Sequence, residues 1–348
     1  MTPPTREARA GLRWGFVGAS AIALNSVAPA VHAQPGSRIA AVQSRSSERG
    51  EAFRHAVGAE RVHTELADLL ADPDVDAVYI STVNNHHAEQ AVAAAEAGKH
   101  VLCEKPIGLS VADATRAVQA AEKAGVVFAT NHHMRNSAPH EQMRSRIAAG
   151  QIGIPLSAAV RHVVLLPESA RGWRTEDSAA GAGVALDILV HDADTLRYVL
   201  NADPESVTAQ TINQGVCAPG IDDDIQGVLR FPSLLAGFHE AFTTSYASTV
   251  LAVYGTEGAL IGNGIQSMQP VGSLTLRTAG GDHEVDLGRR EDLYVRALRR
   301  FTEAVREGTA PAASGEDGIW SVAVAVAALE SASTGRTIGL DPLEEFDG

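Results

Sequence analysis

The first third of the chain alternates short apolar runs with helical stretches. The apolar runs predict strands over residues 12–18, 38–43, 76–82, 100–104 and 126–131. Helical periodicity covers residues 19–33, 64–70, 89–98 and 111–124. Short strands that alternate with helices are typical of a parallel sheet covered on both faces. Residues 12–131 are therefore predicted to form a doubly wound α/β domain of the Rossmann type.

After residue 131 the pattern changes to successive strands with short turns. Apolar runs predict strands at 156–166, 207–213, 226–231, 235–242, 249–254 and 274–276. Helices are predicted at 139–149, 186–200, 292–306 and 318–333. Successive strands favour antiparallel pairing, so residues 132–348 are predicted to form an α+β domain with a predominantly antiparallel, open-faced sheet.

Composition narrows the class of protein. A length of 348 residues suits two domains, and 45% hydrophobic with 20% charged residues is ordinary for globular proteins. The net charge of −14 argues against nucleic acid or an anionic membrane as a partner. Two cysteines give no disulfide framework, residues 1–11 show no export signal, and no run approaches the ~20 apolar residues of a membrane span. We therefore expect a soluble cytoplasmic protein that acts on a small molecule.

The first predicted strand ends in a glycine turn. Gly18 follows the strand, and Ala19 to Ala23 lead into the helix. This arrangement partly matches the G-x-G-x-x-G/A pattern of dinucleotide-binding units, in which a glycine makes the tight turn and the helix N-terminus faces a pyrophosphate. Ser20 replaces the second glycine, and we expect its hydroxyl either to cap the helix or to bind the phosphate.

The second predicted strand ends in hydroxyl and basic residues. NAD enzymes carry an acidic residue near this point for the ribose 2′-hydroxyl, whereas this chain has Ser44, Arg45 and Arg49. Arginine can bind a 2′-phosphate in a bidentate manner, so the segment predicts NADP(H). The alternative is an ordinary exposed helix start with serine caps.

The stretch from Lys99 to Gly108 places a charged pair at the end of a buried strand. The apolar residues 101–103 are followed by Glu104, Lys105 and Pro106, and proline ends the strand because it has no N–H to donate. Doubly wound folds bind their ligands at this edge of the sheet. A cis X-Pro bond here would direct the Lys105 amine inward. The alternative is a surface lysine before a loop.

The predicted helix 186–200 places Asp187 and His191 four residues apart, on one face. Two alternatives are an exposed ion pair and a metal site with the aspartates at 192 and 194. No Cys or His spacing completes such a site, so we expect no metal. Two histidine pairs, at 86–87 and 132–133, are expected to point to opposite faces if the chain is extended, and thus not to share a metal.

Lys105 and His191 supply the groups that ketone reduction needs. A nicotinamide provides the hydride, and the protein must provide a proton donor and a cation or hydrogen-bond donor for the developing alkoxide. Imidazole is suited to proton transfer near neutral pH. We expect the proton to come from His191 with Lys105 assisting. Neither a Ser–His–Asp order nor a P-loop is evident.

Three motifs together resemble the glucose–fructose oxidoreductase/inositol dehydrogenase (Gfo/Idh/MocA) family, whose members pair a Rossmann domain with a mixed-sheet domain. The motifs are the glycine turn at Gly18, Glu104-Lys105-Pro106 and Asp187-x-x-x-His191. Within the family the likeness is greatest to bacterial enzymes that reduce 1,5-anhydro-D-fructose, which share the Ser20 departure. It runs from about residue 12 to 335, through RWGFVGASAIA (13–23), VLCEKP (101–106), NHHMRN (131–136), LDILVHDADTLRYVLN (186–201), HEAFTT (239–244), YGTEGALIG (254–262) and GEDGIWS (315–321).

The resemblance implies NADPH-dependent reduction of the ketone of 1,5-anhydro-D-fructose to 1,5-anhydro-D-mannitol. It implies that the Lys105–Pro106 bond is cis and that Lys105 and His191 meet the substrate, with Asp187 beside them. Alternatives are another sugar or cyclitol dehydrogenase of the family, or a nucleotide-sensing regulator without turnover. Family members occur as monomers or pair through the second-domain sheet.

The coenzyme-binding residues expected from the turn and from the resemblance are Gly18, Ala19, Ser20, Ala21, Ile22, Ala23, Ser44, Arg45, Arg49, Thr82, Val83, Asn84, Asn85, His86, His87, Glu104, Lys105, Asn131 and, from the second domain, Trp173, Arg174 and Tyr294.

Overall fold

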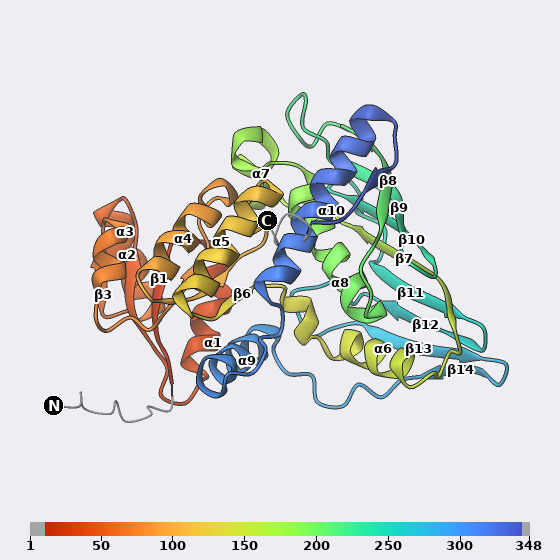
Figure 1. The fold of residues 1–348 in the computed structure, drawn as a ribbon, viewed down its shortest axis with the longest axis horizontal. Coiled ribbons are helices and arrows are strands. Elements are labelled where there is room, and N and C mark those ends of the chain that lie inside the picture. Colours follow the sequence, from red (N-terminus) through yellow and green to blue (C-terminus); the bar gives the residue numbers. More distant parts are fainter. Residues whose placement is uncertain (1–10, 343–348) are drawn as a thin grey trace. The chain divides into compact units, whose positions relative to one another are not determined.

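The computed structural model describes residues 11–342, which form two compact units (Figure 1). The expected N-terminal tail and the acidic C-terminal end fall almost wholly in residues 1–10 and 343–348, outside the described residues. The described part of the first unit is the chain up to Glu104 with Arg116–Asn131 and Tyr294–Ser314, and that of the second is Lys105–Thr115, His132–Leu293 and the chain from Gly315 onward.

The first unit contains a six-stranded parallel sheet in the order β3-β2-β1-β4-β5-β6, as expected for a doubly wound fold. β3 has no counterpart in the sequence prediction, because three half-buried residues at the sheet edge give no apolar run. The strands are β1 (Arg13–Val17), β2 (Arg38–Gln43), β3 (Arg61–His63), β4 (Ala77–Ile80), β5 (His100–Cys103) and β6 (Phe128–Thr130).

Helices cover both faces of this sheet. The helical segments are η1 (Ala23–Val27), α1 (Ala28–His32), α2 (Ser47–Val57), α3 (Leu66–Ala71), η2 (Asn84–His86), α4 (His87–Glu96), α5 (Val111–Ala124) and α9 (Leu293–Glu307). Trp14 and Phe16 pack on one face with α1, α2 and α9. Gly15 points to the other face, where an added Cβ would lie 2.9 Å from a methyl carbon of Leu69 on α3.

Helix α9 corrects the expected domain boundary. The sequence analysis assigns residues 292–306 to the second domain, but Tyr294, Leu298 and Phe301 lie in the core of the first unit. The rings of Trp14 and Phe301 are 5.3 Å apart between centroids. Burial of this apolar stripe against the Rossmann sheet determines where the helix belongs, and sequence order gives no sign of it.

The second unit contains a nine-stranded mixed sheet in the order β14-β13-β12-β11-β7-β10-β9-β8-β15. All its pairings are antiparallel except that of β7 with β10, so the predicted sheet type is confirmed. The strands are β7 (Pro155–Val163), β8 (Ser206–Ile212), β9 (Asp224–Arg230), β10 (Leu235–Ala241), β11 (Val250–Gly255), β12 (Gly258–Asn263), β13 (Ser273–Thr278), β14 (Gly281–Glu284) and β15 (Ile338–Gly339).

Three of these strands were not predicted. β12 is bounded by glycine and contains only a short apolar run, A-L-I. β14 is exposed throughout, and β15 has two residues. β14 and β15 are the two edge strands of the sheet and have no inward-facing apolar alternation, which is the signal that identifies a strand in a sequence.

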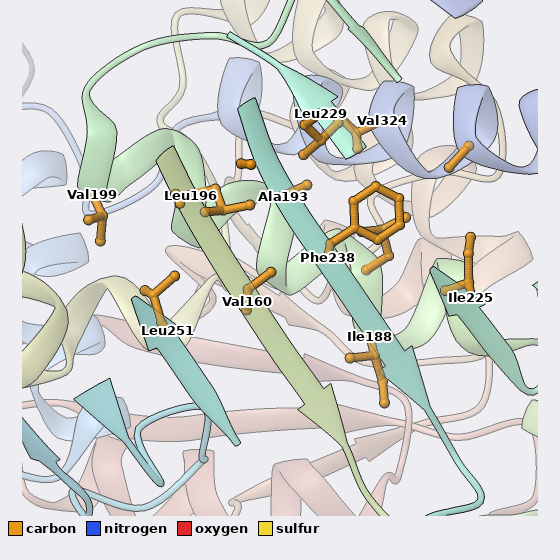
Figure 2. Packing of buried hydrophobic residues seen from close by; sticks show 14 of the residues in the cluster. Val160, Ile188, Ala193, Leu196, Val199, Ile225, Leu229, Phe238, Leu251 and Val324 are labelled. Carbon is orange, nitrogen blue, oxygen red and sulfur yellow. The ribbon is translucent and has the colours of Figure 1, made fainter. Parts of the chain in front are cut away.

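Helices cover one face of the nine-stranded sheet (Figure 1). The helical segments are η3 (His133–Asn136), α6 (Ala138–Ala148), η4 (Glu168–Ala170), α7 (Trp173–Glu176), η5 (Ser178–Ala180), η6 (Ala185–Leu189), α8 (Val190–Leu200) and α10 (Gly315–Thr334). Figure 2 shows Val160 and Phe238 of the sheet packed with Leu196 of α8 and Val324 of α10. Leu156 and Leu235 belong to the other face and are more than half exposed, which agrees with an open-faced sheet.

None of the helices among residues 11–342 is both long enough and apolar enough to span a membrane.

Candidate active site

The glycine turn after β1 is built as the sequence predicts. Gly18 adopts a φ of +97°, a conformation that favours glycine, and an added Cβ would lie 2.9 Å from Thr82 Cγ2 and 3.1 Å from the Thr82 amide nitrogen. Ser20 Oγ accepts a hydrogen bond from the Ala23 amide at 3.1 Å, so the hydroxyl caps the helix. The same hydroxyl donates to Ser81 Oγ at 2.8 Å, which ties the turn to the end of β4.

The basic segment after β2 lies beside this turn. Ser44 is buried and Arg45 is exposed, while Ser46 caps α2 by accepting from the Arg49 amide at 3.2 Å. Arg49 Nη2 donates to the Ala19 carbonyl at 3.4 Å. The structure thereby brings together the glycine turn and the arginine that the sequence assigns to the coenzyme.

The loop after β4 carries the remaining predicted residues of this region, from Val83 to His87. Asn84 and His87 are buried, Asn85 is exposed, and Val83 and His86 are half-buried. His87 Nε2 lies 3.2 Å from the Thr82 carbonyl, and Thr82 Oγ1 donates to Gln90 Oε1 at 2.7 Å. These bonds order the loop at the carboxyl ends of the parallel strands.

Glu104 and Asn131 bind each other at the ends of β5 and β6. Glu104 Oε1 accepts hydrogen bonds from Tyr79 Oη and Asn131 Nδ2, both at 2.6 Å. Burial raises the pKa of Tyr79 well above its usual value, and the charge of Glu104 and the neighbouring Tyr294 add to this. Tyr294 lies in the first unit, not in the second domain as expected.

In the second unit Lys105 is directed at Asp187. The Lys105–Pro106 bond is cis, as the resemblance implies. Lys105 Nζ donates to the Asp187 carbonyl at 2.7 Å and to Asp187 Oδ1 at 3.0 Å. The two side chains are 14% and 19% exposed. The alternative of a surface lysine is therefore wrong.

Asp187 lies on a π-helical turn rather than on the predicted continuous α-helix. Residues 185–189 form η6, which leads directly into α8 and His191. π-Turns of this kind often occur at functional sites because they redirect a carbonyl and a side chain. Here both the carbonyl and the carboxylate of Asp187 face Lys105. The alternative of an exposed Asp187–His191 pair is wrong, since His191 is buried and Asp187 binds Lys105.

Two cations keep Asp187 ionised. Burial opposes ionisation, but the Lys105 amine and the Arg174 guanidinium lower the pKa of Asp187 below its usual value. Arg174 Nε lies 3.7 Å from Asp187 Oδ1, and its guanidinium stacks 4.5 Å above the Trp173 ring. Trp173 and Arg174 are both predicted from the resemblance to contact the coenzyme; in this unit Arg174 borders the Asp187 carboxylate, and Trp173 stacks on Arg174.

Three histidine rings meet in the same cluster. The His133 and His132 rings lie 5.1 and 6.1 Å from the His191 ring between centroids. The prediction that His132 and His133 point to opposite faces applies to extended chain, and that condition is not met, because a 3₁₀ turn begins at His133. No group of His, Cys, Asp or Glu among residues 11–342 is arranged to hold a metal ion.

These imidazoles are uncharged at neutral pH. Burial lowers the pKa of His132 to about 4, although the negative charge of Asp194 acts to raise it. Burial and the charge of Lys105 lower the pKa of His133 to about 3 and that of His191 well below its usual value. His191 Nδ1 is buried without a hydrogen-bond partner among residues 11–342, which leaves Nε2 as the ring nitrogen able to reach a ligand.

An ion-pair network fixes the turn that carries the two histidines. Arg135 donates to Asp194 on α8 at 2.7–3.0 Å and to Asp317 on α10 at 2.7–2.9 Å. His132 Nε2 lies 3.1 Å from Ser321 Oγ. Arg135 thereby anchors the 3₁₀ turn on two helices, and this holds the rings of His132 and His133 against His191.

Sequence reasoning missed a second polar group beside this cluster. It comprises His162, Asp192, Glu240, Gln266 and His140, all buried. The available signal was the strand alternation, because His162 and Glu240 occupy inward positions in register with Val160 and Phe238. A polar residue at an inward position of an apolar strand marks a functional or structural requirement.

Comparison with known proteins decides the family. Residues 12–132 match the oxidoreductase family with an NAD-binding Rossmann fold, and residues 140–261 match the Gfo/Idh/MocA C-terminal domain. The chain is 47% identical to 1,5-anhydro-D-fructose reductase of Ensifer adhaerens over 330 residues, which cover 94% of this chain and 98% of that one. The chain belongs to the Gfo/Idh/MocA family.

The likeness extends to more distant relatives and to a solved structure. D-xylose 1-dehydrogenase (NADP(+)) 2 of Haloferax volcanii is 29% identical, with 95% of this chain and 100% of the relative covered. The solved structure of aldose-aldose oxidoreductase from Caulobacter crescentus superposes with a TM-score of 0.87 at 25% identity, covering 95% of this chain and 100% of that one. As a member of the Gfo/Idh/MocA family, this protein is an NAD(P)-dependent oxidoreductase, which confirms the family, fold and enzyme class predicted from sequence.

The first unit fits a dinucleotide by its own geometry. Gly18 lies so close to Thr82 that a side chain at position 18 would collide with it. Ser20 caps the helix that follows, and Arg49 adds a positive charge at Ala19. A pyrophosphate needs a tight turn, a helix N-terminus and nearby cations, and these residues supply each of them.

Proposed function

We propose that this protein uses NADPH to reduce the ketone of 1,5-anhydro-D-fructose to 1,5-anhydro-D-mannitol. The observation that carries the proposal is the Lys105–Asp187 pair beside His191. Support for the substrate comes from the 47% identity to 1,5-anhydro-D-fructose reductase, which extends over both units.

Lys105 offers one hydrogen to a carbonyl oxygen. An ammonium group has three N–H donors, and Asp187 accepts two of them through its carbonyl and Oδ1. The third is available for the substrate ketone. Asp187 orients the amine, so Lys105 can stabilise the negative charge that develops on the oxygen.

NADPH, when bound, supplies the hydride to the carbonyl carbon. The carbonyl π electrons move to oxygen, and the oxygen takes a proton. A neutral imidazole is a poor acid, and the pKa of His191 lies well below its usual value. We therefore assign the transferred proton to the Lys105 ammonium, which regains one from solvent. The role that we assign to His191 is a hydrogen bond from its Nε2 to the substrate. This reverses the division of roles expected from sequence.

The preference for NADPH rests on the segment after β2. A 2′-phosphate carries about −1.5 to −2 charge at neutral pH, and the adjoining side chains are hydroxyls and arginines. Arg49 already lies at the glycine turn, and Arg45 is exposed next to buried Ser44. We infer that these three residues hold the 2′-phosphate.

A substrate panel tests the proposal. Purified protein is assayed with NADPH and 1,5-anhydro-D-fructose, and with NADP⁺ or NAD⁺ and myo-inositol, D-xylose or D-glucose. We expect the highest kcat/KM with anhydrofructose and NADPH. A higher kcat/KM with inositol or an aldose would mean that the protein is another sugar or cyclitol dehydrogenase of the family. Myo-inositol 2-dehydrogenase and D-xylose 1-dehydrogenase are among its relatives.

A further inference from the structure

A buried carboxylate orders the loop between β8 and β9, which comprises residues 213–223. Asp223 is fully buried at the end of this loop. Its carboxylate accepts hydrogen bonds from three backbone amides of the loop, those of Gln214 and Val216 at 2.7 Å and that of Cys217 at 3.1 Å. A carboxylate in the interior must be compensated by hydrogen-bond donors, so the backbone is held in the conformation that supplies them.

Asn213 stabilises the loop from its other end. Its Nδ2 donates to three backbone carbonyls, those of Cys217, Ala218 and Ile221 at 3.1, 2.9 and 2.7 Å. Its Oδ1 accepts from the Gly215 amide at 2.8 Å. Side chains at both ends of the loop therefore bind its backbone amides and carbonyls, which makes the loop a single ordered element.

The loop contacts two segments of the candidate site, α7 and the start of η6. The Ala218 amide donates to the Thr175 carbonyl of α7 at 2.8 Å. The Asp222 carbonyl accepts from the Val184 amide, directly before η6, at 3.1 Å. Gly183 has a φ of +106°, and an added Cβ would lie 3.3 Å from the Asp222 carbonyl oxygen, so the two backbones pack closely at this point.

Gly183 also joins these two segments to each other. Its amide donates to the Arg174 carbonyl at 3.0 Å, and its carbonyl accepts from the Asp187 amide at 3.3 Å. The position of Arg174 relative to Asp187 thus depends on backbone that the loop contacts. Burial raises the pKa of the Cys217 thiol to about 11, and the charges of Asp223 and, further down, Asp187 act in the same direction, which agrees with a loop close to the site.

We propose that Asp223 is a positioning residue: through the loop 213–223 it holds α7 and the start of η6 so that Arg174 stays against Asp187, the residue that orients Lys105. The proposal rests on the proposed function, in which Lys105 stabilises the charge on the substrate oxygen. Asp187 accepts from the Lys105 amine through both its carbonyl and its carboxylate, so a shift of this turn redirects the remaining N–H. A displacement of about 1 Å can lower turnover about 100-fold.

Thiol labelling of the free protein tests whether Asp223 orders the loop. Cys217 is 7% exposed, and Cys103 is fully buried in β5 of the first unit. In Asp223→Ala a maleimide reagent should label Cys217 at least about tenfold faster than in wild type, because the loop opens locally, while Cys103 stays protected. Equal labelling rates of Cys217 in wild type and in the folded variant would overturn the proposal.

The pKa of Asp187, followed by carbon-13 NMR of the free protein, tests the second step. Burial opposes ionisation, yet the Lys105 and Arg174 cations lower this pKa in wild type, so Arg174→Leu should raise it. Asp223→Ala should raise it as well, and the rise in the double variant should be smaller than the sum of the two, because both changes weaken the same contact. Additive rises, or an unchanged pKa in Asp223→Ala, would contradict the positioning role.

Kinetics with NADPH and 1,5-anhydro-D-fructose test the consequence for turnover, where Asp223→Ala should lower kcat about 10- to 100-fold. Ser331→Ala is the matched control. Ser331 is also fully buried in the second unit, and its hydroxyl binds the Ala209 amide of β8 and the Arg336 carbonyl at 3.0 and 2.6 Å, outside the loop. The control should lower stability without a comparable loss of kcat, and equal losses in the two variants would refute the proposal.

Asn213→Ala is the milder variant if Asp223→Ala does not fold. It keeps the bonds of Asp223 and should change the thiol labelling, the pKa of Asp187 and kcat in the same directions by smaller amounts. Wild-type values for all three would refute the proposal. If wild type does not reduce the sugar, the proposed function fails, and the labelling and NMR measurements still decide whether Asp223 holds Arg174 at Asp187.

Discussion

Replacement of Lys105 by methionine removes the charge on which the proposed chemistry depends. The variant keeps a side chain of similar length but loses the bonds of Nζ to the Asp187 carbonyl and Oδ1, at 2.7 and 3.0 Å. Loss of one donor to a developing oxyanion costs about 2.7–4 kcal/mol, which corresponds to a factor of 10² to 10³ in kcat. We expect a loss of this size.

The effect on stability should be smaller than the effect on turnover. Breaking a buried ion pair costs about 3–5 kcal/mol when it leaves an unpaired charge. Asp187 keeps Arg174 at 3.7 Å and is 19% exposed, so we expect the free energy of unfolding to fall by about 1–3 kcal/mol. Urea unfolding and NADPH fluorescence titration measure folding and cofactor binding separately from turnover.

Lys99 provides the matched control. Its amine also donates to two oxygens, the carbonyls of Asp72 and Val75, at 2.9 and 2.8 Å, and it lies directly before β5 in the first unit. Lys99→Met removes the same chemical group and a similar number of bonds, so it should affect stability without a 10²-fold loss of kcat. The reasoning is refuted if Lys105→Met keeps more than about a tenth of wild-type kcat, or if both variants lose turnover equally.

Three further outcomes follow from the charges. Arg49→Ala should weaken NADPH binding about 10- to 100-fold with little effect on NADH, measured by titration with each cofactor; equal losses would make the arginine structural. Because the pKa of His191 lies well below its usual value, kcat/KM for reduction should not rise when the pH is lowered from about 8 to 6. An imidazolium donor would instead make kcat/KM increase as the pH falls. The pKa values of His132 and His133, about 4 and 3, are lowered in the folded state, so the unfolded chain binds protons first as the pH falls below about 6.5. The free energy of unfolding should therefore decrease from pH 7 to 5 in urea titrations, by about 1.4 kcal/mol per histidine per pH unit at most, and a flat profile would contradict neutral buried rings.

The sequence predicts the elements whose signals are local. The apolar run I-A-A-V locates β2 to the residue, and the alanine-rich helical stretch locates α5 to the residue. Proline at 106 correctly ends β5. Gly18 identifies the turn because only glycine readily adopts its φ of +97°. The Lys–Pro and Asp-x-x-x-His motifs likewise mark the residues that meet in the second unit.

The features that escaped prediction depend on distant partners. α9 joins the Rossmann core through Trp14, which is nearly 300 residues earlier in the chain. The π-turn at Asp187 has no known local code, and its helix reads as an uninterrupted α-helix. The Glu240–His162 pairing requires β7 and β10 to be parallel neighbours, although about 70 residues separate them. Strand alternation alone gives the face of a residue, not its partner on another strand.

The most direct test follows the hydride. NADPH carrying deuterium at C4 of the nicotinamide, on the transferred face, is incubated with the protein and 1,5-anhydro-D-fructose, and the product is examined by NMR. The account predicts one deuterium on C2 of 1,5-anhydro-D-mannitol, one per NADPH oxidised. Deuterium at another carbon, the epimeric 1,5-anhydro-D-glucitol as product, or NADPH that remains unoxidised would contradict it.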